Sequence, residues 1–193
     1  IFVMDAFGSA HRKQSSTYGV AEYCSETCAG KLFLSELSAL KKIILEPKPP
    51  MLAIVGGSKV STKLNIIDKL SDQVDQLVLG GGIANTFLKA QGFNIGNSLH
   101  DEEFIPSAKK IIKKLEGRDA SLPEVIDVVC GKKLNEYEDA VIKNINDLEA
   151  DDMIFDLGPK SMREISLKIN KAKTILWNGP IGVFEYKQFS KGT

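Results

Sequence analysis

The stretch Ala53-Ile54-Val55-Gly56-Gly57-Ser58-Lys59-Val60-Ser61-Thr62-Lys63 passes from apolar residues through a glycine pair into a polar segment. The apolar run Met51–Val55 is typical of a buried strand, and Lys63–Leu70 shows helical periodicity. Ser61 or Thr62 is the expected helix N-cap, which would place Lys63 in the first turn. A strand, a glycine turn and a helix in this order are the repeating unit of a parallel sheet.

The same order of apolar run and helical segment recurs along the chain. The expected strands are Ile1–Met4, Met51–Val55, Gln76–Leu79, Glu124–Val129, Met153–Phe155 and Thr174–Trp177. The expected helices are Cys28–Leu45, Lys63–Leu70, Ala108–Leu115 and Met162–Ile169. This alternation predicts an α/β fold class, a Rossmann-like three-layer, mostly parallel sheet with helices on both faces.

A proline-rich break divides the chain. Three prolines in Glu46-Pro47-Lys48-Pro49-Pro50 end the preceding helix and favour extended backbone, so we expect a domain boundary there. Segment 134–149 is expected to be a surface excursion. The sequence opens inside a strand, Ile1–Met4, and stops at Thr193 where a new helical pattern begins, so we expect a piece of a longer protein.

The composition argues against nucleic-acid and membrane partners. Lys+Arg and Asp+Glu both number 25, which leaves no net charge to attract nucleic acid or an anionic membrane. No apolar run approaches the roughly 18 residues that cross a bilayer, and the N-terminus lacks a signal-peptide pattern. We expect a cytoplasmic protein, and any anion site must be a local cluster.

Three cysteines, an odd number, argue against a disulfide framework and fit a reducing cytosol. Cys24 and Cys28 are four apart and would share one face of a helix, which suggests a metal site as one alternative. No His or Cys cluster completes four ligands, so thiols without a metal are favoured.

Glycine-bearing turns follow several expected strands. They are Val55-Gly56-Gly57-Ser58-Lys59, Leu79-Gly80-Gly81-Gly82, Leu157-Gly158-Pro159 and Trp177-Asn178-Gly179-Pro180. Ligands of open parallel sheets bind beyond the carboxyl ends of the strands, and glycine lets the backbone approach a base or a phosphate. This pattern favours a nucleotide cleft. Tight strand-to-helix turns without a ligand are the alternative.

Two basic constellations could serve such a cleft. Lys59 and Lys63 bracket the start of a helix, whose free N–H groups also favour phosphate, although the spacing is not that of a Walker A loop. His11 and Arg12 close the stretch Asp5–Arg12, and a guanidinium can engage two oxygens of a phosphate or carboxylate. Solvated lysines and a surface turn are the alternatives.

Taken together, these blocks resemble the phosphoglycerate kinase family. Its patterns are matched in order, over essentially the whole chain. The matching blocks are Asp5-Ala6-Phe7-Gly8-Ser9-Ala10-His11-Arg12, Cys28-Ala29-Gly30 with its Leu-rich helix, Ala53–Lys63, Gly80-Gly81-Gly82-Ile83-Ala84-Asn85-Thr86-Phe87, Asp156-Leu157-Gly158-Pro159 and Trp177-Asn178-Gly179-Pro180-Ile181-Gly182-Val183-Phe184-Glu185. The resemblance implies a remnant of the substrate domain at 1–27, an interdomain helix at 28–46 and a truncated nucleotide-binding domain at 47–193.

The resemblance also implies a reaction and a set of roles. The family transfers a phosphoryl group between 1,3-bisphosphoglycerate and ADP, giving 3-phosphoglycerate and ATP, with Mg²⁺. By position, Arg12 matches the arginine that grips phosphoglycerate, with His11 in support. Lys59 matches the lysine that follows the transferring group. The matches on the nucleotide side are Gly57, Gly81 and Gly82 at adenine, Lys63 and Asn178 at the phosphates, Val183 at the base or sugar and Glu185 at the ribose hydroxyls.

Parts of the family pattern are missing. The Asp-Phe-Asn and His-Leu-Gly-Arg substrate motifs are absent, as is the Gly-Gly-Gly-Asp stretch whose aspartate holds the metal. We therefore expect no metal ligand in this chain and no turnover from it alone. We expect a monomer whose partners are ADP or ATP and, in the intact enzyme, the phosphoglycerates.

Two other classes of function are alternatives. A stand-alone module that senses adenine nucleotide would share the glycine turns, and codons for the missing motifs in the parent reading frame would argue against it. A dinucleotide-binding dehydrogenase domain needs Gly-x-Gly-x-x-Gly after a strand and an acidic residue about 20 positions further on. That hexad does not occur here.

Overall fold

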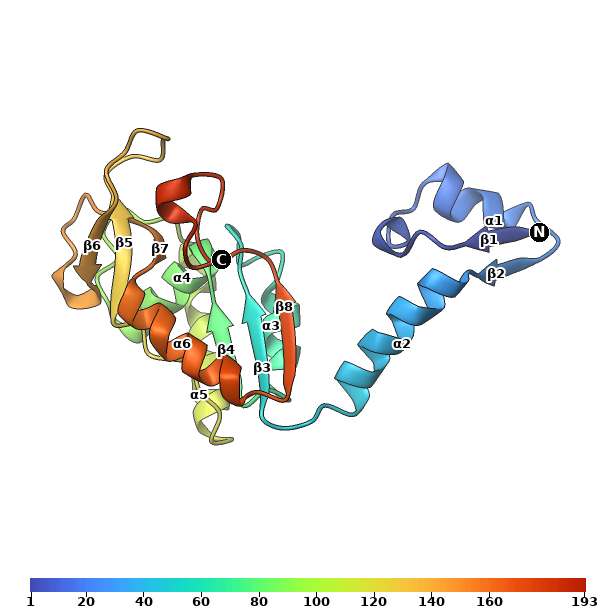
Figure 1. The fold of residues 1–193 in the computed structure, drawn as a ribbon, viewed down its shortest axis with the longest axis horizontal. Coiled ribbons are helices and arrows are strands. Elements are labelled where there is room, and N and C mark those ends of the chain that lie inside the picture. The colour runs from blue at the N-terminus through green and yellow to red at the C-terminus, as the bar shows by residue number, and fades with distance from the viewer. The chain divides into compact units, whose positions relative to one another are not determined.

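A computed structural model describes all residues, 1–193, and divides into two compact units, Ile1–Lys48 and Pro49–Thr193. The first unit contains one sheet and the second contains two, as Figure 1 shows. No helix combines the length and the apolar character that a membrane crossing requires.

The first unit is a two-stranded parallel sheet followed by a long helix. Strand β1 (Phe2–Met4) pairs with β2 (Thr27–Ala29), and the short helix α1 (Val20–Glu22) lies between them in sequence. Helix α2 runs from Lys31 to Leu45. It therefore begins three residues later than the expected helix at Cys28, because Thr27–Ala29 are drawn into the sheet. Cys24 and Cys28 consequently do not share a helix face.

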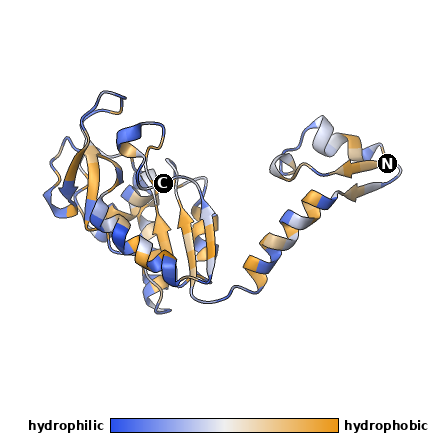
Figure 2. Ribbon diagram, in the orientation of Figure 1, coloured by the Kyte–Doolittle hydropathy of each residue, from blue (hydrophilic) through white to orange (hydrophobic).

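The first unit buries almost nothing. Gly30 is its one buried residue, and no apolar side chain of 1–48 is buried. Asp5 accepts a hydrogen bond from the backbone N–H of Phe33 at 2.8 Å, which satisfies one free donor at the start of α2. The apolar stripe of α2, visible in Figure 2, is left exposed. Its exposed members are Leu32, Leu34, Leu37, Ile44 and Leu45.

The second unit contains two three-stranded sheets. The first sheet is parallel in the order β4-β3-β8, and the second is antiparallel in the order β6-β5-β7. The strands are β3 (Met51–Val55), β4 (Gln76–Leu79), β5 (Asp127–Gly131), β6 (Val141–Asn144), β7 (Met153–Leu157) and β8 (Thr174–Asn178). Both β3 and β5 are buried along their full length, as the central strand of each sheet.

Helices cover these strands. They are α3 (Leu64–Leu70), α4 (Gly81–Gln91), α5 (Ile105–Glu116) and α6 (Pro159–Lys171). Helix α6 packs against β5, while α4 packs against β7 and α5. In Figure 1, α6 crosses in front of the strands and α4 lies behind them. The expected α/β architecture with helices on both faces is confirmed.

One apolar cluster joins the two sheets. It combines residues of β3, β4, β7 and α6 with Ile181. Its buried members are Leu52, Ile54, Val78, Leu157, Ile165 and Ile181. The two sheets thus share a core, and this core fixes the carboxyl ends of β3 and β4 beside the turn that contains Ile181.

The antiparallel sheet departs from the expected mostly parallel arrangement. Strand β6 lies inside segment 134–149, which was expected to be a surface excursion, and β5 is shifted toward the C-terminus from the expected Glu124–Val129. Its strand β5 pairs antiparallel with both β6 and β7. Strand β6 is mostly exposed, so its sequence lacks the apolar run that marked the other strands.

Candidate functional site

Three of the four glycine turns meet at the carboxyl edge of the parallel sheet. The N–H of Gly56, after β3, donates to the carbonyl of Asn178 at 2.9 Å, and the N–H of Gly80, after β4, donates to Val55 at 3.1 Å. The N–H of Gly81 donates to the carbonyl of Ile181 at 2.8 Å, which links the turn after β4 to the segment that follows β8. The fourth turn is used differently, because Gly158 packs against the carboxylate of Asp127 at the start of α6.

Glycine is required at this edge because the backbones touch. Gly57, Gly81 and Gly179 have φ values of +147°, +61° and +88°, a region that other residues rarely adopt. A Cβ on Gly81 would lie 2.6 Å from the carbonyl oxygen of Gly57, and a Cβ on Gly82 would overlap the carbonyl oxygen of Ser58. The start of α4 therefore rests directly on the turn after β3.

The ammonium group of Lys63 lies within this cluster. Its Nζ donates to the carbonyl of Gly56 at 2.6 Å and reaches that of Asn178 at 3.5 Å. A Cβ on Gly57 would lie 3.6 Å from Nζ, and one on Gly179 would lie 2.7 Å from it. Burial lowers the pKa of Lys63. A partly desolvated cation held by neutral carbonyls is suited to an incoming anion.

Lys63 reaches this position from a different local structure than expected. Helix α3 begins at Leu64 with Lys63 as its N-cap, and no side chain caps it. The expected N-cap at Ser61 or Thr62 is wrong, because the Thr62 hydroxyl turns back to the carbonyl of Lys59 at 3.0 Å. Helix α3 is also only seven residues long, so the ammonium of Lys63 rather than a helix dipole supplies the charge here.

The other candidate residues are not all joined to this cluster. Lys59 lies in the same loop as Lys63, with an exposed side chain. Val183 packs against the cluster of Val129, Phe155 and Phe189. Glu185 follows it on an exposed stretch.

Arg12 and His11 are exposed residues of the first unit. Arg12 joins a local turn, in which its N–H donates to Ser9 O at 3.0 Å and its carbonyl accepts from the Thr17 hydroxyl.

Sequence reasoning missed two side chains that shape this edge. Trp177 donates from Nε1 to the carbonyl of Gly179 at 2.8 Å and so braces the turn after β8. Asp156, buried at the end of β7, accepts from the N–H groups of Leu157 and Gly192 at 2.9 and 2.8 Å. Burial raises the pKa of Asp156 to about 6, against these hydrogen bonds. Neither role had a local sequence signal, since both depend on contacts made by folding.

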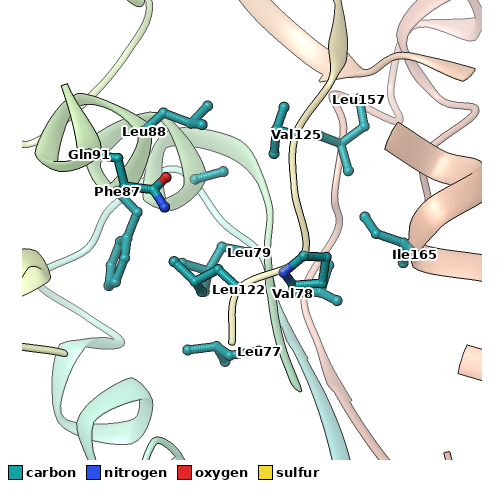
Figure 3. Close-up of a pocket in the computed structure, with 12 residues that line it drawn as sticks. Leu77, Val78, Leu79, Phe87, Leu88, Gln91, Leu122, Val125, Leu157 and Ile165 are labelled. Carbon is teal, nitrogen blue, oxygen red and sulfur yellow. The ribbon is translucent and has the colours of Figure 1, made fainter. Parts of the chain in front are cut away.

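The apolar cavity in Figure 3 is not part of this edge. It lies among β4, α4 and α6, and Gln91 is the one polar side chain in its lining. None of the candidate residues lines it. It is an apolar pocket beside the hydrophobic core, with the exposed Gln91 in its lining.

A magnesium ion does not fit the residues of the glycine edge. Mg²⁺ is bound through carboxylates and substrate phosphates. This edge offers backbone carbonyls, an ammonium and the buried carboxylate of Asp156, whose oxygens already accept from the N–H groups of Leu157 and Gly192. Glu149, Asp151 and Asp152 do gather elsewhere, but Lys132 contacts all three, at 3.0, 2.6 and 2.9 Å. Lys143 also contacts Glu149 and Asp152, so two lysines offset two of the three negative charges of this cluster.

The fold and this edge define an α/β protein of the open-sheet class, in which ligands bind beyond the carboxyl ends of parallel strands. The family model described as phosphoglycerate kinase matches residues 1–193. The chain belongs to the phosphoglycerate kinase family.

Two relatives named phosphoglycerate kinase are each 54% identical to the whole chain. They come from Francisella philomiragia subsp. philomiragia and Mannheimia succiniciproducens, and the chain covers 49% and 48% of them. The chain thus spans about half the length of the curated relatives it matches.

Solved structures agree with this assignment. The phosphoglycerate kinase from Coxiella burnetii superposes with a TM-score of 0.89 at 49% identity, over 100% of this chain and 49% of that one. The enzyme from Pyrococcus horikoshii OT3 gives a TM-score of 0.83 at 27% identity, over 99% and 48%. The expected Rossmann-like α/β class is therefore confirmed.

Proposed function

We propose that the protein containing this chain transfers a phosphoryl group between ATP and 3-phosphoglycerate, and that the chain alone does not turn over. The observation that carries the proposal is the Lys63 ammonium among the glycine turns after β3, β4 and β8. Membership of the family over the full chain supports the same reaction.

In the proposed reaction, an oxygen of the 3-phosphoglycerate carboxylate forms a bond to the γ-phosphorus of ATP. The bond from that phosphorus to the β,γ-bridging oxygen breaks, and its electron pair leaves with ADP. The reverse direction gives ATP from 1,3-bisphosphoglycerate. The transition state is loose and highly charged, so the protein mainly positions the reactants and neutralises charge.

The nucleotide would lie along the glycine edge. Gly57, Gly81 and Gly82 would face adenine, while Lys63 and Asn178 would meet the phosphates. Val183 would contact the base or sugar. Glu185 would accept hydrogen bonds from the ribose hydroxyls, because an ionised carboxylate only accepts and these hydroxyls can donate.

The reacting groups need positive charge on both sides. Lys59 would follow the transferring phosphoryl, and its exposed side chain is free to do so. Arg12 would hold phosphoglycerate with two parallel hydrogen bonds, supported by His11. Magnesium would accompany the nucleotide. Its protein ligand is not among the residues of the glycine edge.

Substitution of Lys59 tests this assignment in a full-length phosphoglycerate kinase carrying this sequence. Lys59→Ala should lower kcat by about 100-fold or more while the nucleotide Kd changes little, because its charge acts in the transition state. Arg12→Ala should raise the KM for 3-phosphoglycerate and leave nucleotide binding alone. Steady-state kinetics and nucleotide titration measure these effects.

Lys69→Ala is the matched control. Lys69 is an exposed lysine near the end of α3, and its ammonium makes no hydrogen bond or ion pair. Its loss should leave both constants unchanged. Equal losses of kcat and nucleotide affinity in Lys59→Ala would contradict the role given to Lys59.

A further inference from the structure

The peptide group between Lys59 and Val60 is held from both sides. Its carbonyl accepts from the Thr62 hydroxyl at 3.0 Å, and its N–H donates to Oδ2 of Asp101 at 2.7 Å, across 41 residues of sequence. The Val60 side chain is fully buried. Because this peptide adjoins the Cα of Lys59, its orientation sets where the Lys59 side chain starts.

The next peptide group, between Val60 and Ser61, begins the turn that delivers Lys63. The carbonyl of Val60 accepts from the N–H groups of Lys63 and Leu64, at 2.9 and 2.8 Å. Lys63 then reaches back to Gly56. One carboxylate therefore anchors the loop from which both lysines project.

Asp101 is itself fixed to helix α4. Its N–H donates to the Thr86 hydroxyl at 3.0 Å, and that hydroxyl donates to the carbonyl of Gly82 at 2.9 Å. Asn85 holds the chain two residues before Asp101, because its side-chain amide donates to the carbonyl of Leu99 at 2.9 Å. Thr86 and Asn85 are 0% and 2% exposed, so these bonds are shielded from water.

Local structure does not account for the carboxylate. Asp101 stands just before the short helical turn Glu102–Phe104, where an aspartate usually caps its own helix. Its side chain makes no such cap and instead bonds to Val60. The carboxylate therefore acts on the lysine loop and not on the segment that carries it.

We propose that Asp101 is a positioning residue for phosphoryl transfer. It fixes the Lys59–Val60 peptide to the start of α4, so that the two lysines and the adenine-side glycines Gly81 and Gly82 keep one relative geometry. The inference rests on the proposed function, since it assigns Asp101 to the same site. A group held this way contributes by pre-organisation, where small misplacements are costly.

Kinetics in the full-length enzyme carrying this sequence test the proposal. Asp101→Ala should lower kcat by about 10- to 100-fold through misplacement of the lysines, with the KM for 3-phosphoglycerate within about two-fold of wild type. Asp101→Asn should recover most of the activity, because the amide oxygen also accepts from the Val60 N–H. Glu103→Ala, an exposed acidic neighbour, is the control and should behave as wild type.

A second measurement is independent of turnover. Amide hydrogen exchange in the 193-residue chain should show faster exchange at Val60, Lys63 and Leu64 in Asp101→Ala, with the amides of β3 unchanged. Asp101→Asn should retain the wild-type protection.

The outcomes separate the two claims. A wild-type enzyme without phosphoglycerate-dependent turnover would overturn the proposed function, whatever the exchange pattern. An active wild type with undiminished kcat in Asp101→Ala would overturn the inference about Asp101. So would an Asp101→Asn variant no better than Asp101→Ala.

Discussion

Lys63, at the carboxyl edge of β3, β4 and β8, differs from Lys132 and Lys143 at the antiparallel sheet in the kind of group that holds its ammonium. Lys63 is bonded to neutral carbonyls, and burial lowers its pKa. Lys132 and Lys143 are bonded to carboxylates, and these hydrogen bonds raise their pKa values. An anion meeting Lys63 has no ion pair to break, so Lys63 fits a binding role and the other two fit a structural one.

Single backbone contacts at the carboxyl edge of β3, β4 and β8 also affect the stability of the second unit. Alanine at Gly82 should destabilise the second unit by about 1–3 kcal/mol, because its Cβ would overlap the carbonyl of Ser58. Within a helix the same change normally stabilises by about 0.5–1 kcal/mol, so the sign alone is informative. Urea unfolding of Gly82→Ala measures the loss.

Gly117→Ala is the control for this substitution. Gly117 ends α5 with φ of −65°, and the nearest atom to its added Cβ would be Lys113 O at 3.4 Å. Its unfolding free energy should stay near that of wild type. A Gly82→Ala protein as stable as Gly117→Ala would mean that α4 can move away from the turn after β3.

At the scale of elements, a charge network ties the sheet β6-β5-β7 together. Asp152 is 1% exposed and contacts Lys132 at 2.9 Å and Lys143 at 2.8 Å. Burial acts to raise its pKa, but hydrogen bonds from Lys143, Lys132 and the N–H of Glu149 outweigh burial and lower the pKa to about 2. In the central strand β5 of the same sheet, burial raises the pKa of the Cys130 thiol to about 12.

Asp152→Asn should therefore reduce stability in a pH-dependent way. In the wild type, the folded-state pKa of Asp152 is depressed. Its carboxylate therefore stabilises the folded state above pH 3.8, and this stabilisation is lost as the pH falls towards about 2. We expect a loss of about 2 kcal/mol near neutral pH that disappears in acid. Denaturant unfolding across this pH range gives the difference between wild type and variant.

Asp151→Asn controls for charge alone. The Asp151 side chain is 74% exposed and contacts the same Lys132 at 2.6 Å. An exposed ion pair is screened by water and salt and contributes little to stability, so this variant should stay close to wild type. If both variants lost equal stability, burial of Asp152 would not be the source of its effect.

Elements also show how far the sequence could predict this fold. Strands β3, β4 and β8 and their glycine turns were predictable, because buried apolar runs followed by glycine leave a local pattern. Helix α4 was not predicted, since eight of its eleven residues are buried and it shows no amphipathic stripe. The antiparallel pairing of β5 was also missed, because the alternation of strand and helix says nothing about strand β6.

The site was partly predictable for a related reason. The glycine turns and Lys63 could be recognised from the sequence as one cluster, because each of these turns follows a strand of the same sheet. The hydrogen bond from the Val60 N–H to Asp101 joins residues 41 positions apart, and an aspartate before a helical turn looks like an ordinary cap. Long-range hydrogen bonds of this kind leave no periodic signal.

At the scale of the whole molecule, the two units differ in how much apolar surface they bury. The second unit has a continuous core across both sheets. The first unit buries no apolar side chain, although α2 carries five exposed leucine and isoleucine residues. A unit with so little buried apolar surface gains little hydrophobic stabilisation to offset its conformational entropy.

This asymmetry bears on activity, because the two halves of the proposed reaction fall on different units. Arg12 and His11 belong to the first, and the glycine edge belongs to the second. The chain spans about half of its relatives, and kinases of this kind gain rate when a closing motion excludes water around both substrates. We therefore expect the isolated chain to show no 3-phosphoglycerate-dependent ATP consumption above the buffer blank.

A coupled spectrophotometric assay measures this directly, with a full-length phosphoglycerate kinase as the positive control. Adding the chain to the full-length enzyme should leave the rate unchanged, which excludes an inhibitor in the preparation. Turnover by the chain that approaches the control would contradict the expectation. It would mean that the poorly buried first unit still presents Arg12 to a substrate, and that the second unit needs no further element to align the phosphates.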